Sequence, residues 1–396
     1  MSYQPGWHFL QVPGPSNVPQ RILRAIDLPT IDHRGPEFAR MTFEIIAGLK
    51  RVFGTSGDVV IYAASGSGAW EAAIRNALQA GDRALMFETG QFSALWRGIA
   101  QRNGIEVDYL ESDWRGPIDA ARIEERLRRD GAHAIKAVMV VHNETSTGVL
   151  SDIPAVRRAM DAARHPALLM VDVVSSLGSA DYRHDDWGVD VAVGGSQKGL
   201  MLPPGLAFNA ISAKALAAAR SHGDAAGYFS WVDHLAANRD GSFPQTPATN
   251  LLYGLRESLR MLEEQGLPNV FARHLRHAEA TRRAAGVWGL ELQCLDAASY
   301  SPSLTAMRVP DGHDADALRA TILERFNMSL GTGLGKVKGT VFRLGHLGDF
   351  NDLMLAGALG GIQMGLALHG LGSAGGVDAA LAYLAETSAG RALAAT

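Results

Sequence analysis

Apolar runs alternate with amphipathic stretches along this chain from about residue 58, and this alternation restricts the fold more than any other feature of the sequence. It is typical of consecutive βαβ units, in which helices join the parallel strands of one sheet and cover its faces. Helices are expected at 70–78, 94–102 and 155–163, and strands at 59–63, 83–88, 137–141, 167–171, 189–193 and 207–211. The sequence therefore predicts an α/β fold with a mostly parallel sheet.

Chain length and a change of pattern predict two domains. The 396 residues exceed the ~100 to 200 residues of a usual single domain. Near Gly266 the alternation gives way to a long helix at 269–287, and a second α/β unit follows, with strands near 290–295, 304–309 and 340–344. We expect a large domain at 16–265 and a small domain at 266–396, with residues 1–15 as an irregular arm that packs on another subunit.

Composition describes an ordered protein and excludes several classes of function. Hydrophobic residues make up 47% of the chain and charged residues 20%, without a low-complexity tract. The formal net charge of −4 gives no reason to expect a nucleic acid partner. Cys294 is the only cysteine, so neither an internal disulfide nor a cysteine metal cluster can form, and no metal site is expected. We expect a cytoplasmic protein, because a lone cysteine suits a reducing compartment and residues 1–15 lack the features of a secretory signal.

One apolar segment has the length of a membrane span. Residues 353–371 are almost wholly apolar, and about 20 apolar residues suffice to cross a bilayer. The segment nevertheless contains five glycines together with Gln363 and His369, and it opens at Asn351-Asp352, a good helix cap. We interpret it as a buried, closely packed helix of the small domain, and we expect no association with a membrane.

Lys198 is the candidate for covalent chemistry. It lies in the turn Gly194-Gly195-Ser196-Gln197-Lys198-Gly199, directly after the candidate strand at 189–193. The chain has six lysines, and the other five lie in helical stretches, before a strand or beside a glycine loop. A lysine in a loop is usually solvated, but the end of a parallel strand is where α/β enzymes bind ligands. An amine at that position is suited to form a Schiff base with the aldehyde of pyridoxal phosphate.

Asp172 ends the apolar run at 167–171, and it would lie beside Lys198 if their two strands are neighbours. A buried carboxylate is costly unless a cation meets it. The protonated pyridine nitrogen of pyridoxal phosphate is such a cation, and the carboxylate would keep it protonated so that the ring can accept electrons. A helix cap or a partner for a buried arginine is the alternative. Together, Lys198 and Asp172 predict a pyridoxal phosphate site at one edge of the sheet.

A glycine-rich turn, Ser65-Gly66-Ser67-Gly68, separates a predicted strand from a predicted helix. Backbone amides and hydroxyls at a helix N-terminus suit a phosphate group, because the helix dipole favours an anion there. The dinucleotide pattern requires a third glycine at position 71, which is Glu71, and the Walker pattern is absent. The turn therefore favours a small phosphate monoester over NAD or ATP, with a plain tight turn as the alternative.

Three further side chains follow a predicted strand or interrupt one. Phe92 follows the strand at 83–88, where its ring would either stack on a flat cofactor or pack in the core. Thr145 follows the strand at 137–141 and is placed to donate to the phenolic oxygen of the cofactor. Arg343 interrupts an apolar strand, where a planar guanidinium suits a substrate carboxylate and a structural ion pair is the alternative.

These motifs resemble the class V aminotransferases of pyridoxal phosphate fold type I, in particular the bacterial serine-glyoxylate aminotransferases and their alanine-glyoxylate relatives. The resemblance covers nearly the whole chain and extends to Pro13-Gly14-Pro15, Asp32-His33-Arg34, Thr246-Pro247 and residues 65–71, 142–148 and 342–348. It implies a large domain with a mostly parallel seven-stranded sheet covered by helices, and a smaller C-terminal α/β domain. It also implies a homodimer, or a tetramer, with shared active sites.

The resemblance implies how pyridoxal 5'-phosphate would be held. Lys198 would be the Schiff-base lysine and Asp172 the partner of the pyridine nitrogen, and these two are the expected catalytic residues. Phe92 would stack on the ring, and Thr145 would contact its phenolic oxygen. The phosphate would be bound by residues from two subunits, namely Ser65, Gly66, Ser67 and Gln197 of one and Thr246 of the other.

The substrate pocket is also implied by the resemblance. Arg343 would hold the α-carboxylate of the substrate, and His33 and Arg34 would reach the pocket from the other subunit. Relatives often carry a tyrosine immediately before the threonine at 246, whereas this chain has Gln245. This difference leaves the preferred amino donor open.

The expected activity is transfer of the amino group of L-serine to glyoxylate, which gives hydroxypyruvate and glycine. Aspartate and alanine are alternative donors, and Arg34 is suited to hold the second carboxylate of aspartate. A cysteine desulfurase shares the fold but needs a nucleophilic thiol in a mobile loop, whereas Cys294 lies in a predicted strand. The alternatives from other classes are a nicotinamide-dependent oxidoreductase, which the parallel sheet and glycine-rich turn would also fit, and a non-catalytic binding protein.

Overall fold

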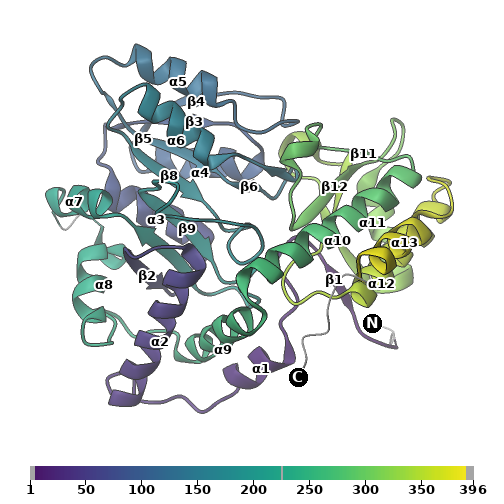
Figure 1. Ribbon diagram of the computed structural model, residues 1–396, viewed down its shortest axis with the longest axis horizontal. Coiled ribbons are helices and arrows are strands. Elements are labelled where there is room, and N and C mark those ends of the chain that lie inside the picture. The colour runs from purple at the N-terminus through teal and green to yellow at the C-terminus, as the bar shows by residue number, and fades with distance from the viewer. Residues whose placement is uncertain (1–4, 224–225, 389–396) are drawn as a thin grey trace.

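A computed structural model describes residues 5–223 and 226–388 and places them in two α/β lobes (Figure 1). The larger lobe is built on a seven-stranded sheet in the order β2-β10-β9-β8-β5-β3-β4. Strand β10 (Ala207–Ile211) runs antiparallel to β2 (Asp58–Tyr62) and β9 (Val191–Gly195). All other neighbours pair in parallel, and the remaining strands are β3 (Arg83–Phe87), β4 (Glu106–Leu110), β5 (Ile135–Val141) and β8 (Leu168–Asp172). The predicted α/β fold with a mostly parallel seven-stranded sheet is confirmed.

Edge strand β4 is the one strand of this sheet that the sequence does not predict. Its sequence is Glu-Val-Asp-Tyr-Leu, and none of its side chains is fully buried. The buried strands read as continuous apolar runs because helices cover both of their faces. An edge strand with two acidic residues lacks that signal, so the alternation of apolar runs could not reveal it.

Helices cover both faces of the large sheet (Figure 1). Side chains from α2 (Pro36–Phe53) and α9 (Thr249–Gln265) join the core on one face, and those from α3 (Gly66–Ala77) and α4 (Gln91–Arg102) join the core on the other. The remaining helices of this lobe are α1 (Gln20–Ile26), α5 (Ala120–Arg129), α6 (Ile153–Ala162), α7 (Ala213–Ser221) and α8 (Trp231–Asn238). The three predicted helices are therefore present as α3, α4 and α6, each starting a few residues earlier than its apolar spacing indicates.

The smaller lobe has a five-stranded sheet in the order β1-β13-β14-β12-β11. Its strands are β1 (Phe9–Gln11), β11 (Glu291–Leu292), β12 (Leu304–Arg308), β13 (Met328–Thr332) and β14 (Val341–Gly345), and its helices are α10 (Leu267–Val287), α11 (Ala315–Phe326), α12 (Asp352–Leu368) and α13 (Gly376–Ser388). The sequence predicts β12, β14 and α10 closely but not β13, because a serine and a glycine interrupt its apolar residues. The domain limits at 16–265 and 266–396 stay predictions.

The N-terminal segment contains a strand that the sequence does not predict. Residues 1–15 are expected to be irregular, but Phe9–Gln11 form β1, which pairs in parallel with β13. That expectation is wrong for these residues, since a three-residue strand is too short to show a periodic pattern. Residues 1–4 lie outside the described residues. Packing of the arm on another subunit stays a prediction.

Helix α12 corresponds to the apolar segment at 353–371. The side chain of Asn351 caps it by accepting a hydrogen bond from the amide of Met354. Gly365 approaches α11 so closely that a Cβ atom there would lie 2.3 Å from Cγ1 of Ile322, which confirms close packing. The helix is not wholly buried, because Leu353 and Leu368 are exposed. Within residues 5–223 and 226–388, no helix combines the length and apolar character that a membrane crossing requires.

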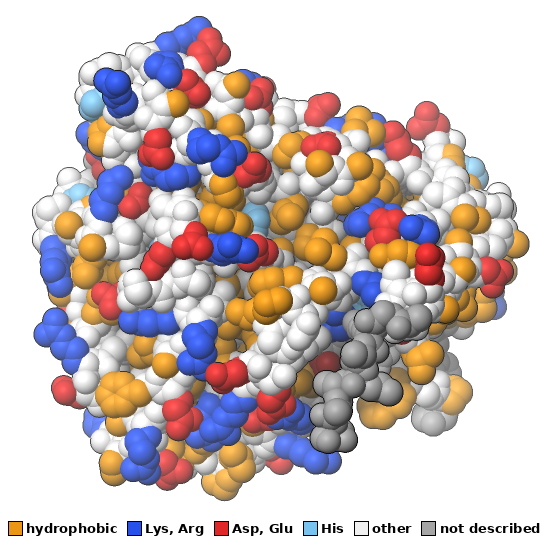
Figure 2. All heavy atoms as spheres, viewed as in Figure 1, with side chains coloured by type: hydrophobic (Ala, Val, Ile, Leu, Met, Phe, Trp, Pro, Cys, Tyr) orange, Lys and Arg blue, Asp and Glu red, His pale blue; other side chains and the backbone are white. Residues whose placement is uncertain are grey.

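Charged side chains of both signs are interspersed on the face shown in Figure 2. Some of the chain's charges form ion pairs one helical turn apart, such as Arg128 with Glu124 on α5 and Arg157 with Asp161 on α6. A nucleic acid backbone is usually met by a continuous basic stripe. The face in view carries mixed charge instead.

Strand order in the large sheet determines where the site forms. Strands β8 and β9 are parallel neighbours, and Asp172 at the end of β8 lies opposite Val193 of β9. The turn that carries Lys198 begins where β9 ends, at Gly195. Both groups therefore reach the same carboxyl edge of the sheet, although 25 residues separate them in the sequence.

Candidate active site

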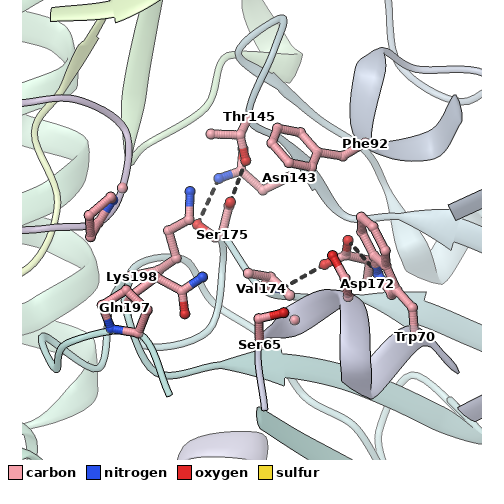
Figure 3. A pocket seen from close by; sticks show the side chains of 15 residues that line it. Ser65, Trp70, Phe92, Asn143, Thr145, Asp172, Val174, Ser175, Gln197 and Lys198 are labelled. Carbon is pink, nitrogen blue, oxygen red and sulfur yellow. Dashed lines mark hydrogen bonds between the residues drawn. The ribbon is translucent and has the colours of Figure 1, made fainter. Parts of the chain in front are cut away.

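A cavity of about 260 Å³ lies at this edge of the large sheet (Figure 3). Eight of the residues predicted to bind the cofactor line it, namely Ser65, Gly66, Ser67, Phe92, Thr145, Asp172, Gln197 and Lys198. The rest of the wall is formed by Gly14, Pro15, Trp70, Asn143, Val174, Ser175 and Pro204. The fold thus brings together side chains from distant parts of the chain, and their individual roles stay predictions.

Asp172 is a buried carboxylate held by two N–H donors. The backbone amide of Val174 donates to Oδ1 at 2.7 Å, and the indole Nε1 of Trp70 donates to Oδ2 at 3.0 Å (Figure 3). Burial raises the pKa of Asp172 to about 7, although these two hydrogen bonds and the Lys198 ammonium act to lower it. An ionised Asp172 therefore has room, and an electrostatic reason, to accept a cation from the cavity.

Lys198 is buried at the opposite side of the same cavity. Its Nζ donates a hydrogen bond to the backbone carbonyl of Pro13, which belongs to the N-terminal segment. Burial lowers the pKa of the amine to about 7, and the charge of Arg343 lowers it further, while the carboxylates of Asp172 and Glu144 act in the opposite direction. An amine with this pKa is partly uncharged near neutrality, so it can act as a nucleophile or a base.

Gly14 leaves the space that Lys198 occupies. Its φ of +120° lies in the region that favours glycine, and a Cβ atom there would lie 2.4 Å from Cδ of the lysine. Ser16 also holds this segment against the turn that carries Lys198. Its hydroxyl donates to the carbonyl oxygen of Lys198, and its amide donates to that of Gln197. The Pro13-Gly14-Pro15 motif therefore gives Gly14 and Pro15 to the cavity wall and Pro13 as the hydrogen-bond acceptor of Lys198, a role that the sequence alone did not indicate.

The predicted phosphate cradle lies at the start of α3. Ser65 precedes the helix in an extended conformation, and its hydroxyl caps no backbone amide of the first turn. The amides of that turn lack partners within the helix, which is the arrangement that binds anions. Gln197 also lines the cavity, where its side-chain amide nitrogen can donate to a phosphate oxygen. Free amide donors at a helix N-terminus fit a phosphate ester.

Phe92 and Thr145 also line the cavity (Figure 3). Phe92 is in the first turn of α4, and its ring is tilted against that of Trp70 at a centroid distance of 6.5 Å. The hydroxyl of Thr145 is hydrogen-bonded to the hydroxyl of Ser175. When Ser175 donates in this pair, the hydrogen of the Thr145 hydroxyl can point to a ligand oxygen. Both positions suit the face and the phenolic edge of a flat aromatic ring.

Arg343 is a buried guanidinium at the centre of β14. Its Nη1 donates to the carbonyl oxygen of Thr145 at 2.7 Å, and its Nε donates to that of Thr332 at 2.8 Å. Burial lowers the pKa of Arg343 to about 10. Because its partners here are carbonyl oxygens rather than carboxylates, its positive charge remains available to a carboxylate ligand.

Four predicted site residues do not line the cavity of their own chain. Arg343 is one of them, and it bonds to the wall residue Thr145 through the carbonyl oxygen of that residue. Thr246 lies just before α9 and lines a separate pocket. His33 and Arg34 lie in the turn before α2, where Nε2 of His33 is buried without a hydrogen-bond partner and the amide of Arg34 donates to Asp32. The placement of these last three leaves open the prediction that they serve the site of a second subunit.

Trp70 lines the cavity, although the sequence pattern indicates no role for it. It lies on α3, two residues after the glycine-rich turn, and only the folded chain brings its indole to Asp172. Asn143 and Ser175 were missed in the same way, because each becomes a wall residue only through strand order. The only sequence signal that could have suggested them is their position shortly after the end of a predicted strand.

Comparison with known proteins decides the family. The family model described as aminotransferase class-V matches residues 8–338. The chain belongs to the class V aminotransferases. This class V aminotransferase is 48% identical to the serine-glyoxylate aminotransferase of Methylorubrum extorquens over 393 residues, which is 97% of each protein. It is 45% identical to the L-aspartate-glyoxylate aminotransferase of Paracoccus denitrificans, with 96% of each chain covered.

A solved structure supports the same conclusion for the fold. The crystal structure of pyridoxamine-pyruvate aminotransferase from Mesorhizobium loti superimposes with a TM-score of 0.90 at 26% identity, and covers 98% of this chain and 100% of that one. The predicted fold type I arrangement is confirmed. Membership of an aminotransferase family also argues against the two alternatives from other classes, a nicotinamide-dependent oxidoreductase and a non-catalytic binding protein.

Cys294 does not have the properties of a desulfurase nucleophile. It follows β11 and is buried, and its Sγ contacts the carbonyl oxygen of Asp296 at 3.4 Å. Burial raises the pKa of the thiol to about 11, so the reactive thiolate is scarce at neutral pH. The structure agrees with the exclusion made from the sequence, although the observed strand is shorter than the predicted 290–295 and ends before this residue.

Removing the charge of Asp172 should make stability less sensitive to pH. Its folded-state pKa of about 7 lies above the ordinary value of 3.8, so the ionised carboxylate destabilises the cofactor-free protein increasingly from about pH 4 to about pH 7. We expect cofactor-free Asp172→Asn to lose less thermal stability than the wild type between about pH 5 and about pH 8, because the cost of an amide nitrogen opposite one of the two N–H donors is the same at both pH values. The unfolding temperatures of the variant and the wild type at both pH values measure this. An equal difference between the two proteins at both pH values would contradict the raised pKa of Asp172.

Proposed function

We propose that this class V aminotransferase transfers the amino group of L-serine to glyoxylate, with pyridoxal 5'-phosphate bound at Lys198. The products would be hydroxypyruvate and glycine. The observation that carries the proposal is the presence of the Lys198 amine and the Asp172 carboxylate in one buried cavity. Serine as the donor is supported by 48% identity to a serine-glyoxylate aminotransferase, and aspartate is the second candidate because of the 45% identity to an aspartate-glyoxylate enzyme.

Lys198 would bond to the cofactor and later move a proton. When bound, pyridoxal phosphate supplies an aldehyde that reacts with amines and an aromatic ring that withdraws electrons from the substrate α-carbon. The lowered pKa of Lys198 leaves part of the amine uncharged for the first task. Once the substrate amine has displaced it, the same uncharged amine can take the proton from the substrate α-carbon.

Asp172 would hold the pyridine nitrogen in its protonated form. One N–H donor already meets each of its oxygens, and an ionised carboxylate can accept further hydrogen bonds. A cationic N–H would favour the ionised carboxylate, and so offset the burial that raises the pKa of this residue. Trp70 and Val174 would orient the carboxylate toward the ring.

The phosphate and the substrate would occupy different sides of the cavity. Ser65, Gly66, Ser67 and Gln197 would bind the phosphate at the start of α3. Arg343 would bind the α-carboxylate of the amino acid and then that of glyoxylate. Phe92 would stack on the ring and exclude water from one of its faces.

We infer a homodimer with shared active sites, which a tetramer of two dimers would retain. Support comes from Thr246, His33 and Arg34, which do not line the cavity of their own chain. They would complete the phosphate and substrate sites of the partner. We also infer a cytoplasmic location, because the one cysteine, Cys294, is a buried free thiol that suits a reducing compartment.

Replacement of Lys198 tests the covalent step. Lys198→Ala should lose the borohydride-reducible yellow chromophore of the purified enzyme and nearly all transaminase activity, since no other amine takes its place in the cavity wall. Lys214→Ala is the matched control, because Lys214 pairs with Asp190 and lies outside this wall. A colourless but fully active Lys198→Ala enzyme would overturn the proposed function.

A panel of amino donors tests the substrate. With glyoxylate as acceptor, purified enzyme should form oxo acid fastest from L-serine, followed by L-aspartate and then L-alanine. The kcat/KM ratio between donors is the quantity to compare, because it reports discrimination at equal concentration. Should alanine match or exceed both other donors, the proposed donor class is wrong while the aminotransferase chemistry stands.

Arg343→Ala should weaken substrate binding far more than cofactor binding. Loss of a charged hydrogen-bond donor to a carboxylate should raise KM for the amino acid and for glyoxylate by roughly tenfold or more. Arg308→Ala on neighbouring β12 is the control, since that guanidinium is partly exposed and bonds to Gln293. Steady-state kinetics and cofactor titration measure both effects. Unchanged KM values for both substrates would count against a carboxylate clamp.

A further inference from the structure

Glu144 is a fully buried carboxylate next to the cavity that no step described above uses. It forms β6 (Asn143–Glu144) and directly precedes Thr145. Its Oε1 accepts the amide of Phe92 at 3.3 Å and the hydroxyl and amide of Ser146 at 2.7 and 3.0 Å, while its Oε2 accepts the amide of Ser93 at 3.2 Å. Four donors therefore converge on a side chain that has no contact with solvent.

Burial raises the pKa of Glu144, but the hydrogen bonds from these four donors act to lower it and favour the ionised form. All four are donors, and the hydroxyl of Ser146 is itself the acceptor for the amide of Gln91 at 2.8 Å, so its hydrogen is free to point to Glu144. Glu144 and Ser146 together accept the first three amides of α4, where the positive end of the helix dipole offsets a negative charge. The first three amides of the helix are thus capped from a neighbouring element, while the hydroxyl of Ser93 accepts the amide of Gly90.

Gly90 makes room for this arrangement. It precedes α4 and has no side chain to cap the helix, and a Cβ atom at this position would lie 2.5 Å from Cγ of Glu144 and 2.3 Å from the hydroxyl of Ser146. A serine or aspartate at the cap position, the usual solution, would therefore collide with both residues. The local sequence gives up an ordinary cap in favour of a carboxylate from a neighbouring element.

We propose that Glu144 is a positioning residue that fixes the ring of Phe92 against the cofactor and holds the peptide that anchors Arg343. Phe92 lies in the turn whose amides Glu144 accepts, so a change in this cap moves the ring. Thr145 follows Glu144 directly, and its carbonyl oxygen accepts Nη1 of Arg343 at 2.7 Å. One buried anion thus connects the cofactor face to the carboxylate clamp. The inference rests on the proposed cofactor.

The charge of Glu144 also reaches the ionisable groups of the cavity. It acts to raise the pKa of Lys198, of Arg343 and of Asp172. A neutral side chain of the same shape would therefore change the electrostatics of the cavity as well as the cap. A residue that only supported the fold would alter stability without altering either the cofactor or the substrate.

A double-mutant cycle on the holoenzyme tests the connection to Phe92. Glu144→Gln keeps the size of the side chain but places an amide nitrogen opposite a backbone N–H. We expect it to weaken pyridoxal phosphate binding by roughly tenfold and to change the visible circular dichroism of the bound cofactor. In a Phe92→Ala background the same substitution should weaken binding by less than about threefold. An equal factor in both backgrounds would overturn the proposal.

Two further variants separate positioning from general stability. Asp190→Asn changes a carboxylate that is also buried but accepts the amide of Leu169 and the hydroxyl of Ser212, outside the cavity wall. It should lower the unfolding temperature and leave cofactor affinity unchanged, and an equal loss of affinity would overturn the proposal. Ser146→Ala removes only the hydroxyl shared by Gln91 and Glu144, so it decides the cycle if Glu144→Gln does not fold.

The test distinguishes this inference from the proposed function. If the wild type does not bind pyridoxal phosphate, the proposed function fails and the inference fails with it. If the wild type binds the cofactor and Lys198→Ala loses the chromophore, but the cycle between Glu144 and Phe92 is additive, only the positioning role fails.

Discussion

Confinement of an amine and a carboxylate in one buried cavity is the constraint on which the rest of this structure depends. Burial is the largest cause that brings the pKa values of both Lys198 and Asp172 to about 7, from opposite directions. Such groups are unfavourable in a core that needs only stability. They are useful where a reaction needs an amine that can lose its proton and an anion that can meet a cation. The parallel pairing of β8 and β9 puts the two groups at one edge.

The large sheet could be predicted from the sequence because its strands are buried on both faces. Six of them appear as apolar runs, and β8 and β9 are parallel neighbours. The strands that escaped prediction are of another kind. Strand β4 is an edge strand with acidic residues, β13 is interrupted by serine and glycine, and β1 is three residues long. Each is specified by its neighbour in the sheet more than by its own pattern.

The candidate site divides along the same line. Lys198 and Asp172 could be found because a residue that ends a parallel strand has only one edge of the sheet to reach. Trp70 and Glu144 gave no such signal, since their importance lies in hydrogen bonds to residues that are distant in the sequence. The residues proposed to serve a second subunit are a further class, and Thr246 among them lies outside the cavity of its own chain.

The path of the N-terminal segment couples the two lobes mechanically. Strand β1 belongs to the small sheet, but two residues later the Pro13 carbonyl meets the Lys198 ammonium, and Ser16 is bonded to the lysine turn of the large lobe. Gly331 and Gly345 allow this backbone to pass directly over β13 and β14, because a Cβ on either would collide with Pro13 or Val12. A rotation of one lobe against the other would therefore displace the hydrogen-bond acceptor of Lys198, because one short stretch of main chain is bonded to both lobes.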